Sequence, residues 1–166
     1  MTEPVKEGPG EAYDRALQLS LYETIANRRA TYDTMLWQAP VLSLTAQAFL
    51  FTIALGAGNA RLPRFLAGTL ALITALGSMQ LMAKQRFHEQ VDSRLLSLHE
   101  ERTGLAHMVG TPMHGQMEQR VTAAGLVRPW YAKPSSYKLW MAILASFAIA
   151  ATVVVLLAWL HPQVLE

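Results

Sequence analysis

The sequence contains no cysteine, which excludes disulfides, thiolate metal sites and cysteine nucleophiles. Charge is also scarce, because 16% of the residues are charged while 52% are hydrophobic, and the mean hydropathy is +0.20. The net charge of +2 is small and the charges lie in blocks, so we expect no nucleic-acid partner. This composition is too apolar for an ordinary soluble domain of 166 residues.

Three long runs contain no ionisable side chain, and they cover residues 34–56, 65–83 and 139–160. At 1.5 Å per residue, each run is about long enough for a hydrocarbon core of roughly 30 Å. A chain of 166 residues cannot bury three such helices on all sides in a soluble core. The first run follows a segment with six acidic residues, so we expect no signal peptide. We therefore predict three transmembrane helices in contact with the lipid bilayer.

Lysine and arginine predict how these helices are oriented. Eight of them lie between the second and third runs, and Arg28 and Arg29 precede the first run, whereas the connector 57–64 has only Arg61 and Arg64. Basic flanks stay on the cytoplasmic side. We therefore expect a multi-pass protein of the bacterial inner (plasma) membrane, with a cytoplasmic N-terminus and an external C-terminus at 161–166.

The remaining segments are predicted to lie mainly on the cytoplasmic side. Residues 1–10 are rich in proline, glycine and glutamate and are expected to be a disordered tail. Residues 11–33 have apolar side chains at helical spacing, and so has the first part of 84–138, where Phe87, Val91 and Leu95 form a stripe. The predicted fold class is an all-α membrane protein with three transmembrane helices and two cytoplasmic amphipathic helices. Each amphipathic helix needs to cover its stripe, either within the chain or in a homo-oligomer.

Polar side chains occur on two sides of the first predicted span. Ser43 and Gln47 lie on one helical face, while Gln38, Thr45 and Thr52 lie on roughly the opposite face. Such residues either line a polar path or form hydrogen bonds between helices. The spans hold no ionisable residue, which argues against proton-coupled transport and against a charge-selective filter.

Small residues and two arginines complete the candidate sites. Small side chains recur four residues apart in the second and third spans and predict close helix packing, within or between chains; they are Ala67, Ala71, Ala75, Ala142, Ser146 and Ala150. Arg28 and Arg29 precede the first span and are expected to bind anionic lipid headgroups.

Four histidines lie within 84–138, at positions 88, 99, 107 and 114. Their spacing matches no zinc motif, so we expect solvated surface histidines, no metal and no cofactor. The sequence contains no phosphate-binding loop, nucleophile elbow or dinucleotide-binding glycine motif, so we expect no enzyme. An enzyme would need a site among Glu100, Glu101 and the histidines.

The N-terminal helix ends in a basic and aromatic stretch with Tyr22, Arg28, Arg29 and Tyr32, and a tight two-span hairpin and an amphipathic helix at 87–109 follow. This layout resembles SLATT-type bacterial membrane proteins, which are linked to conflict and anti-phage systems. The resemblance covers about the first two thirds of the chain, and the third span at 139–160 departs from it. It implies an effector that oligomerises and perturbs the membrane when a partner senses infection.

Together these patterns predict a small integral membrane protein that oligomerises and forms or gates a pore. The alternative is a non-conducting scaffold that recruits a soluble cytoplasmic protein through its cytoplasmic helices. Both functions use the same helices, so the sequence leaves both open.

Overall fold

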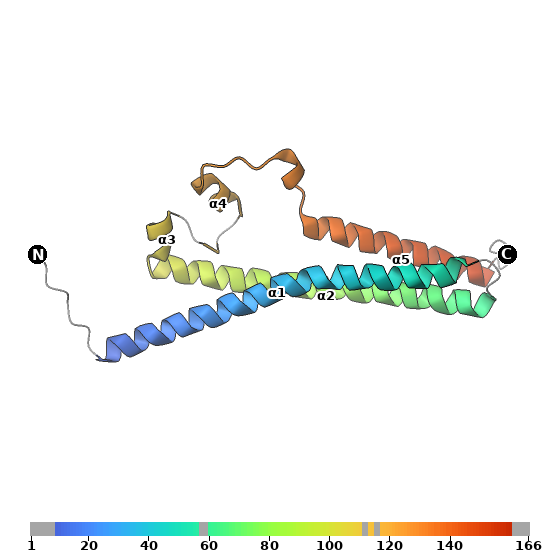
Figure 1. The fold of residues 1–166 in the computed structure, drawn as a ribbon, viewed down its shortest axis with the longest axis horizontal. Coiled ribbons are helices and arrows are strands. Elements are labelled where there is room, and N and C mark those ends of the chain that lie inside the picture. Colours follow the sequence, from blue (N-terminus) through green and yellow to red (C-terminus); the bar gives the residue numbers. More distant parts are fainter. Residues whose placement is uncertain (1–8, 57–59, 111–112, 115–116, 161–166) are drawn as a thin grey trace, which may run out of the picture. The chain divides into compact units, whose positions relative to one another are not determined.

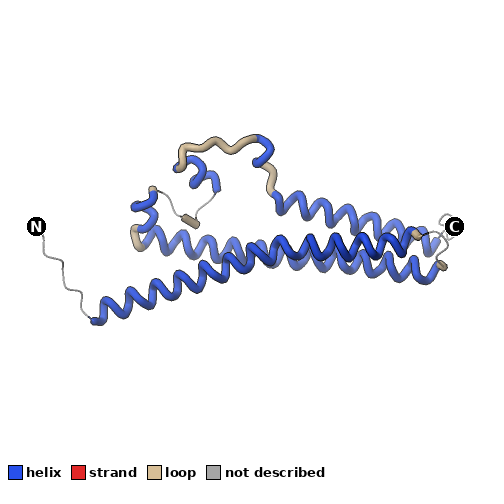
Figure 2. The backbone as a smooth tube through the Cα atoms, viewed as in Figure 1, coloured by secondary structure: helices blue, strands red, loops and turns tan. Residues whose placement is uncertain are grey.

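The computed structural model describes residues 9–56, 60–110, 113–114 and 117–160. Every regular element in these residues is a helix, as Figures 1 and 2 show, which confirms the predicted all-α class. In chain order the elements are α1 (Pro9–Leu55), α2 (Arg61–Arg102), α3 (Leu105–Val109), α4 (Met117–Ala123), the 3-10 turn η1 (Trp130–Ala132) and α5 (Ser136–Leu160). The predicted tail lies mostly, and the C-terminal segment 161–166 wholly, outside the described residues.

Three of these helices are long and apolar enough to cross a membrane, which confirms the three candidate spans. α5, with 25 residues, matches one bilayer crossing. α1 has 47 residues and would be about 70 Å long at 1.5 Å per residue, more than twice the hydrocarbon thickness. α2 has 42 residues and is similarly long. Both helices therefore combine a predicted span with a polar continuation.

The helix predicted from residue 84 is not a separate element. α2 continues through that position and ends at Arg102, because no glycine or proline occurs from position 78 to 103 and nothing else stops the backbone hydrogen bonding. Gly104 then adopts φ 77°, a left-handed conformation that suits glycine, and begins the short α3. Likewise, α1 contains both the predicted helix 11–33 and the first span, and it continues through Pro40.

The chain divides into two compact units. Unit 1 consists of Met1–Tyr32 and His88–Val127, and unit 2 consists of Asp33–Phe87 and Arg128–Glu166. The divisions fall near the predicted start of the first span and end of the second. α1 and α2 contribute to both units, whereas α5 belongs to unit 2 alone.

Unit 2 is a bundle of three helices with two small apolar clusters. One cluster joins Leu36, Met82 and Leu144, one from each helix, and the other joins Ala54, Ala67 and Val154. Helices α2 and α5 approach closely at Gly68, where an added Cβ would lie 3.0 Å from a methyl group of Val155. Large apolar side chains cover the outside of the bundle, as expected for a surface that faces lipid.

Unit 1 buries polar side chains where its sequence pattern predicted apolar ones. Val91 and Leu95 of the predicted stripe are 40% and 46% exposed, whereas Glu89, Asp92 and Glu100 on the same helix are buried. Val91 and Leu95 therefore do not pack on α1, because the carboxylates that face α1 find hydrogen-bond donors there, whereas Leu98 and Leu105 of the same predicted stripe are partly buried. Val91 and Leu95 remain available for contacts outside the chain.

Candidate functional site

Two polar side chains of the first span are buried inside unit 2. Gln47 is fully buried, and its Nε2 donates a hydrogen bond to the carbonyl oxygen of Ala71 on α2, at 2.7 Å. Ser43, one turn earlier, is also buried. Within the described residues, Ser43 Oγ and Gln47 Oε1 have no hydrogen-bond partner. A path along this face would require α1 and α2 to separate, whereas an interhelical hydrogen bond needs no rearrangement.

The opposite face of the span is uncovered. Gln38, Thr45 and Thr52 are exposed and lie outside the helix contacts of unit 2. The two threonine hydroxyls donate hydrogen bonds to carbonyl oxygens one turn earlier on α1, at 3.1 Å and 2.8 Å. Because these hydroxyls are already hydrogen-bonded, the face can meet either lipid or water.

The small residues of the second and third spans have different environments. Ala67, Ala71 and Ala75 on α2 are buried. Ala142, Ser146 and Ala150 on α5 are exposed, because α5 turns another face inward, formed by Leu144, Ala148, Ala151, Val154 and Ala158. Close packing through the α5 set thus stays a prediction, and it concerns contacts between chains.

The two connector arginines bind the C-terminal ends of neighbouring helices, a role that the sequence analysis missed. Arg61 donates to the carbonyl oxygens of Ala158 and Trp159 in the last turn of α5, at 2.8 Å and 2.7 Å. Arg64 donates to the carbonyl oxygen of Gly56, just after α1, at 3.2 Å. Carbonyls at a helix C-terminus lack intrahelical donors and carry partial negative charge, so both cations stabilise these ends.

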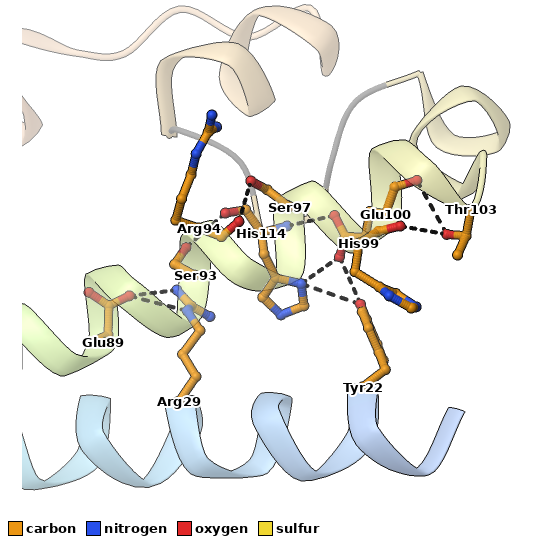
Figure 3. A network of polar contacts seen from close by, with 10 residues as sticks. All are labelled: Tyr22, Arg29, Glu89, Ser93, Arg94, Ser97, His99, Glu100, Thr103 and His114. Carbon is orange, nitrogen blue, oxygen red and sulfur yellow. Dashed lines mark hydrogen bonds and ion pairs between the residues drawn. The ribbon is translucent and has the colours of Figure 1, made fainter. Parts of the chain in front are cut away.

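In unit 1, the two arginines predicted to bind lipid headgroups pair with carboxylates of α2. Arg28 forms a two-pronged ion pair with Asp92, and its Nε lies 2.9 Å from Oδ2. This hydrogen bond raises the pKa of Arg28. Arg29 donates through Nε and Nη2 to Glu89, and Figure 3 shows this pair bridging α1 and α2. Binding to headgroups stays a prediction, and it would have to compete with these pairs.

Glu100 is the centre of the polar network in Figure 3. Its carboxylate is fully buried and accepts a hydrogen bond from the Tyr22 hydroxyl of α1, at 2.7 Å. His114 approaches the same carboxylate twice, through Nδ1 at 2.6 Å and through its backbone N–H at 3.2 Å. Ser93 completes the network by donating to the carbonyl oxygen of His114 at 2.8 Å. Glu100 therefore joins α1, α2 and residues 113–114.

Burial and hydrogen bonding act in opposite directions on this carboxylate. Burial alone would raise the pKa of Glu100, but the hydrogen bonds from His114 and Tyr22 outweigh it and lower the pKa. For Tyr22, burial and the hydrogen bond to Glu100 act together and raise the pKa to about 12. The network is therefore built around an ionised glutamate and a protonated tyrosine.

The expectation of solvated surface histidines is wrong for His114, because Glu100 and Ser93 hold it in a partly buried position. His88 stacks on Tyr32 with ring centroids 5.2 Å apart, and His99 lies 5.6 Å from the ring of Tyr22. The part of the chain that the structure describes contains no group of three side chains able to hold a metal ion. Both Glu100 oxygens accept hydrogen bonds from the chain itself, so the network acts as a structural clasp.

A signal for these pairs is present in the sequence, in the geometry of a helical hairpin. Two antiparallel helices joined by a short connector bring together residues at equal distances from it. Counted from the predicted connector 57–64, this rule places Arg28, Arg29 and Tyr22 within about one helical turn of Asp92, Glu89 and Glu100. It could have identified the three acidic partners, but not His114, which reaches the network from an irregular segment.

Comparison with known proteins adds no relative from which to infer a role. No protein-family model, curated protein or solved structure matches this chain.

Proposed function

We propose that this protein crosses the bacterial inner membrane three times, assembles into a homo-oligomer and forms or gates a pore. The observation that carries the proposal is the exposed face of α1 on which Gln38, Thr45 and Thr52 recur every seven residues, with the apolar side chains Val41 and Phe49 beside them. The threonine hydroxyls can meet either lipid or water, whereas the Gln38 amide gains little from contact with lipid. If several copies turned this face toward a common centre, it would surround a polar path.

The chemistry of this face favours a weakly selective path. Gln38 offers an amide and the two threonines offer hydroxyl oxygens, and the predicted spans hold no charged side chain to select ions by sign. Ser43 and Gln47 are poorer candidates for the pore lining, because the other helices of the same chain bury them.

The orientation that we propose places unit 1 in the cytoplasm. Arg61 and Arg64, the basic residues of the connector, are occupied with the ends of α1 and α5. The remaining lysines and arginines precede the first span or lie between the second and third. By the positive-inside rule, the N-terminus is then cytoplasmic and the C-terminus external.

The resemblance to SLATT-type proteins adds a biological role to this proposal. A protein of that kind would act as an effector in anti-phage defence, and a cytoplasmic partner would trigger it. Unit 1, the folded part outside the predicted spans, would receive such a signal.

The pore is tested by measuring the membrane potential of bacterial cells with a voltage-sensitive dye. Each variant is compared at a matched level in the membrane. We expect wild type to depolarise the cells and the triple variant Gln38→Leu, Thr45→Val, Thr52→Val to leave the potential intact. Thr152→Val is the matched control, because its hydroxyl donates to the Ala148 carbonyl in the same way but lies on α5. If the triple variant depolarises the cells as strongly as wild type, the α1 face does not line the pore.

A scaffold that does not conduct is the second candidate, and the clasp around Glu100 favours it. Tyr22, Glu100 and His114 build a defined folded unit outside the predicted spans, as a docking module requires. The scaffold predicts tolerated overexpression, an unchanged membrane potential with wild type, and a soluble protein that copurifies through residues 84–138.

A further inference from the structure

Unit 1 contains an open groove that its own side chains do not fill. The groove lies between α1 and α2 and has a volume of about 1110 Å³. Its walls are mainly apolar, with Leu21 and Ile25 from α1, Leu95 and Leu98 from α2, and Met108 from α3. Leu21, Leu95 and Met108 are exposed by 56%, 46% and 85%. A groove of this size and openness suits an amphipathic helix better than a small molecule.

The charges along the groove have one sign. Arg15 and Arg102 are among its lining residues, together with His99, and none of the carboxylate residues that the structure describes lines it. An occupant with acidic residues beside an apolar ridge would therefore be complementary to it.

The chain itself offers such a ridge, on the part of α1 that does not line the groove. Tyr13 and Leu17, one turn apart, are 69% and 49% exposed, and Ala16 and Ser20 beside them are small. Asp14 supplies an exposed acidic group next to this ridge. We call these residues, Tyr13, Ala16, Leu17 and Ser20, the α1 ridge.

We propose that the α1 ridge of one copy docks in the groove of the next copy, with Asp14 facing Arg102. The inference rests on the assembly part of the proposed function and names the surface that mediates it. Ridge and groove are different surfaces of one subunit, so each copy can give one and accept one. Contacts of this kind close into a ring when the rotation between copies is suitable, and a ring is the arrangement that a central pore requires.

A second copy fits better than other occupants because of its position. The ridge and the α1 wall of the groove belong to the same stretch of the same helix. Copies that cross the membrane in the same direction hold these surfaces at the same height. Confinement to one membrane also raises their effective concentration.

Disulfide cross-linking tests the docking directly, because the natural chain has no cysteine. Two chains with different tags are coexpressed, one with Leu17→Cys and the other with Met108→Cys, and isolated membranes are oxidised. We expect a cross-linked heterodimer several-fold more abundant than with the control pair Leu17→Cys and Leu126→Cys. Leu126 is 66% exposed in unit 1 but does not line the groove.

Charge reversal provides a second test of the docking. Asp14→Arg or Arg102→Asp, introduced into both cysteine chains, is expected to lower the cross-link yield, and the two changes together are expected to restore it. Recovery in the double variant separates lost docking from lost folding, since a misfolded unit would not recover.

The outcomes separate this inference from the proposed function. Native mass measurements that show an oligomer, without the Leu17–Met108 cross-link or the charge rescue, would overturn the groove contact and leave assembly intact. A strictly monomeric protein in membranes would overturn both. Protection of the Met108→Cys thiol from alkylation without a cross-link would mean that a lipid or another protein fills the groove, which also overturns the inference.

Discussion

The clasp around Glu100 leads to a prediction with a defined magnitude. Tyr22→Phe removes one hydroxyl and with it the 2.7 Å hydrogen bond to the buried carboxylate and the 3.3 Å contact with His114 Nδ1, while His114 keeps both of its contacts with Glu100. A hydrogen bond to a charged group contributes about 1.5–3 kcal/mol to stability. The opening equilibrium of unit 1 should therefore rise roughly tenfold to a hundredfold, since 1.4 kcal/mol corresponds to a factor of ten.

Hydrogen exchange of the protein in lipid nanodiscs measures this opening. We expect faster exchange in the last turns of α2 and in the facing part of α1, with unit 2 unchanged. Tyr13→Phe is the control, because it makes the same chemical change on the same helix at a site that is 69% exposed. Equal exchange in the two variants would refute the argument that the Tyr22 hydrogen bond stabilises unit 1.

Two further predictions concern pH, and one concerns the end of α5. Because the pKa of Glu100 is lowered in the folded protein, the clasp should stabilise unit 1 above the ordinary carboxylate pKa. This contribution should be lost as the pH falls through the depressed value, so the protection of unit 1 from hydrogen exchange, corrected for the slower intrinsic exchange in acid, should fall for wild type and much less for Glu100→Gln. The pKa of Tyr22 is raised rather than lowered, so its contribution to the stability of unit 1 should be present below pH 10 and lost as the pH rises toward about 12. Tyrosinate absorbance of wild type, compared with that of Tyr22→Phe, would contradict this if Tyr22 titrated near pH 10. Arg61→Ala should destabilise the bundle by about 1–3 kcal/mol, because it removes two charged hydrogen bonds to the last turn of α5; an unchanged midpoint of SDS-induced unfolding would contradict that role.

The sequence was sufficient to predict the three candidate spans, because their signal is local. A run such as 139–160, without an ionisable side chain, has few alternatives to a membrane helix at this chain length. Helix ends were harder to place. The change from apolar to polar residues near position 84 suggested a new element, but the backbone responds to glycine and proline rather than to polarity, so α2 continues to Arg102.

The packing of unit 1 could not be read from apolar spacing. That pattern assumes that apolar side chains face the neighbouring helix, whereas Asp92 and Glu100 face it here and Val91 and Leu95 remain exposed. The ion pair between Arg28 and Asp92 follows from the hairpin register once the two long helices are recognised. The position of His114 depends on the irregular chain after α3, for which periodicity gives no information.

Ion release from liposomes that contain the purified protein would show whether the exposed face of α1 lines a pore. Wild-type protein should release ions, the triple variant Gln38→Leu, Thr45→Val, Thr52→Val should release none, and Thr152→Val should release as much as wild type. Tight liposomes with wild-type protein that is verified to be oligomeric, or equal release by the triple variant, would contradict a pore lined by this face.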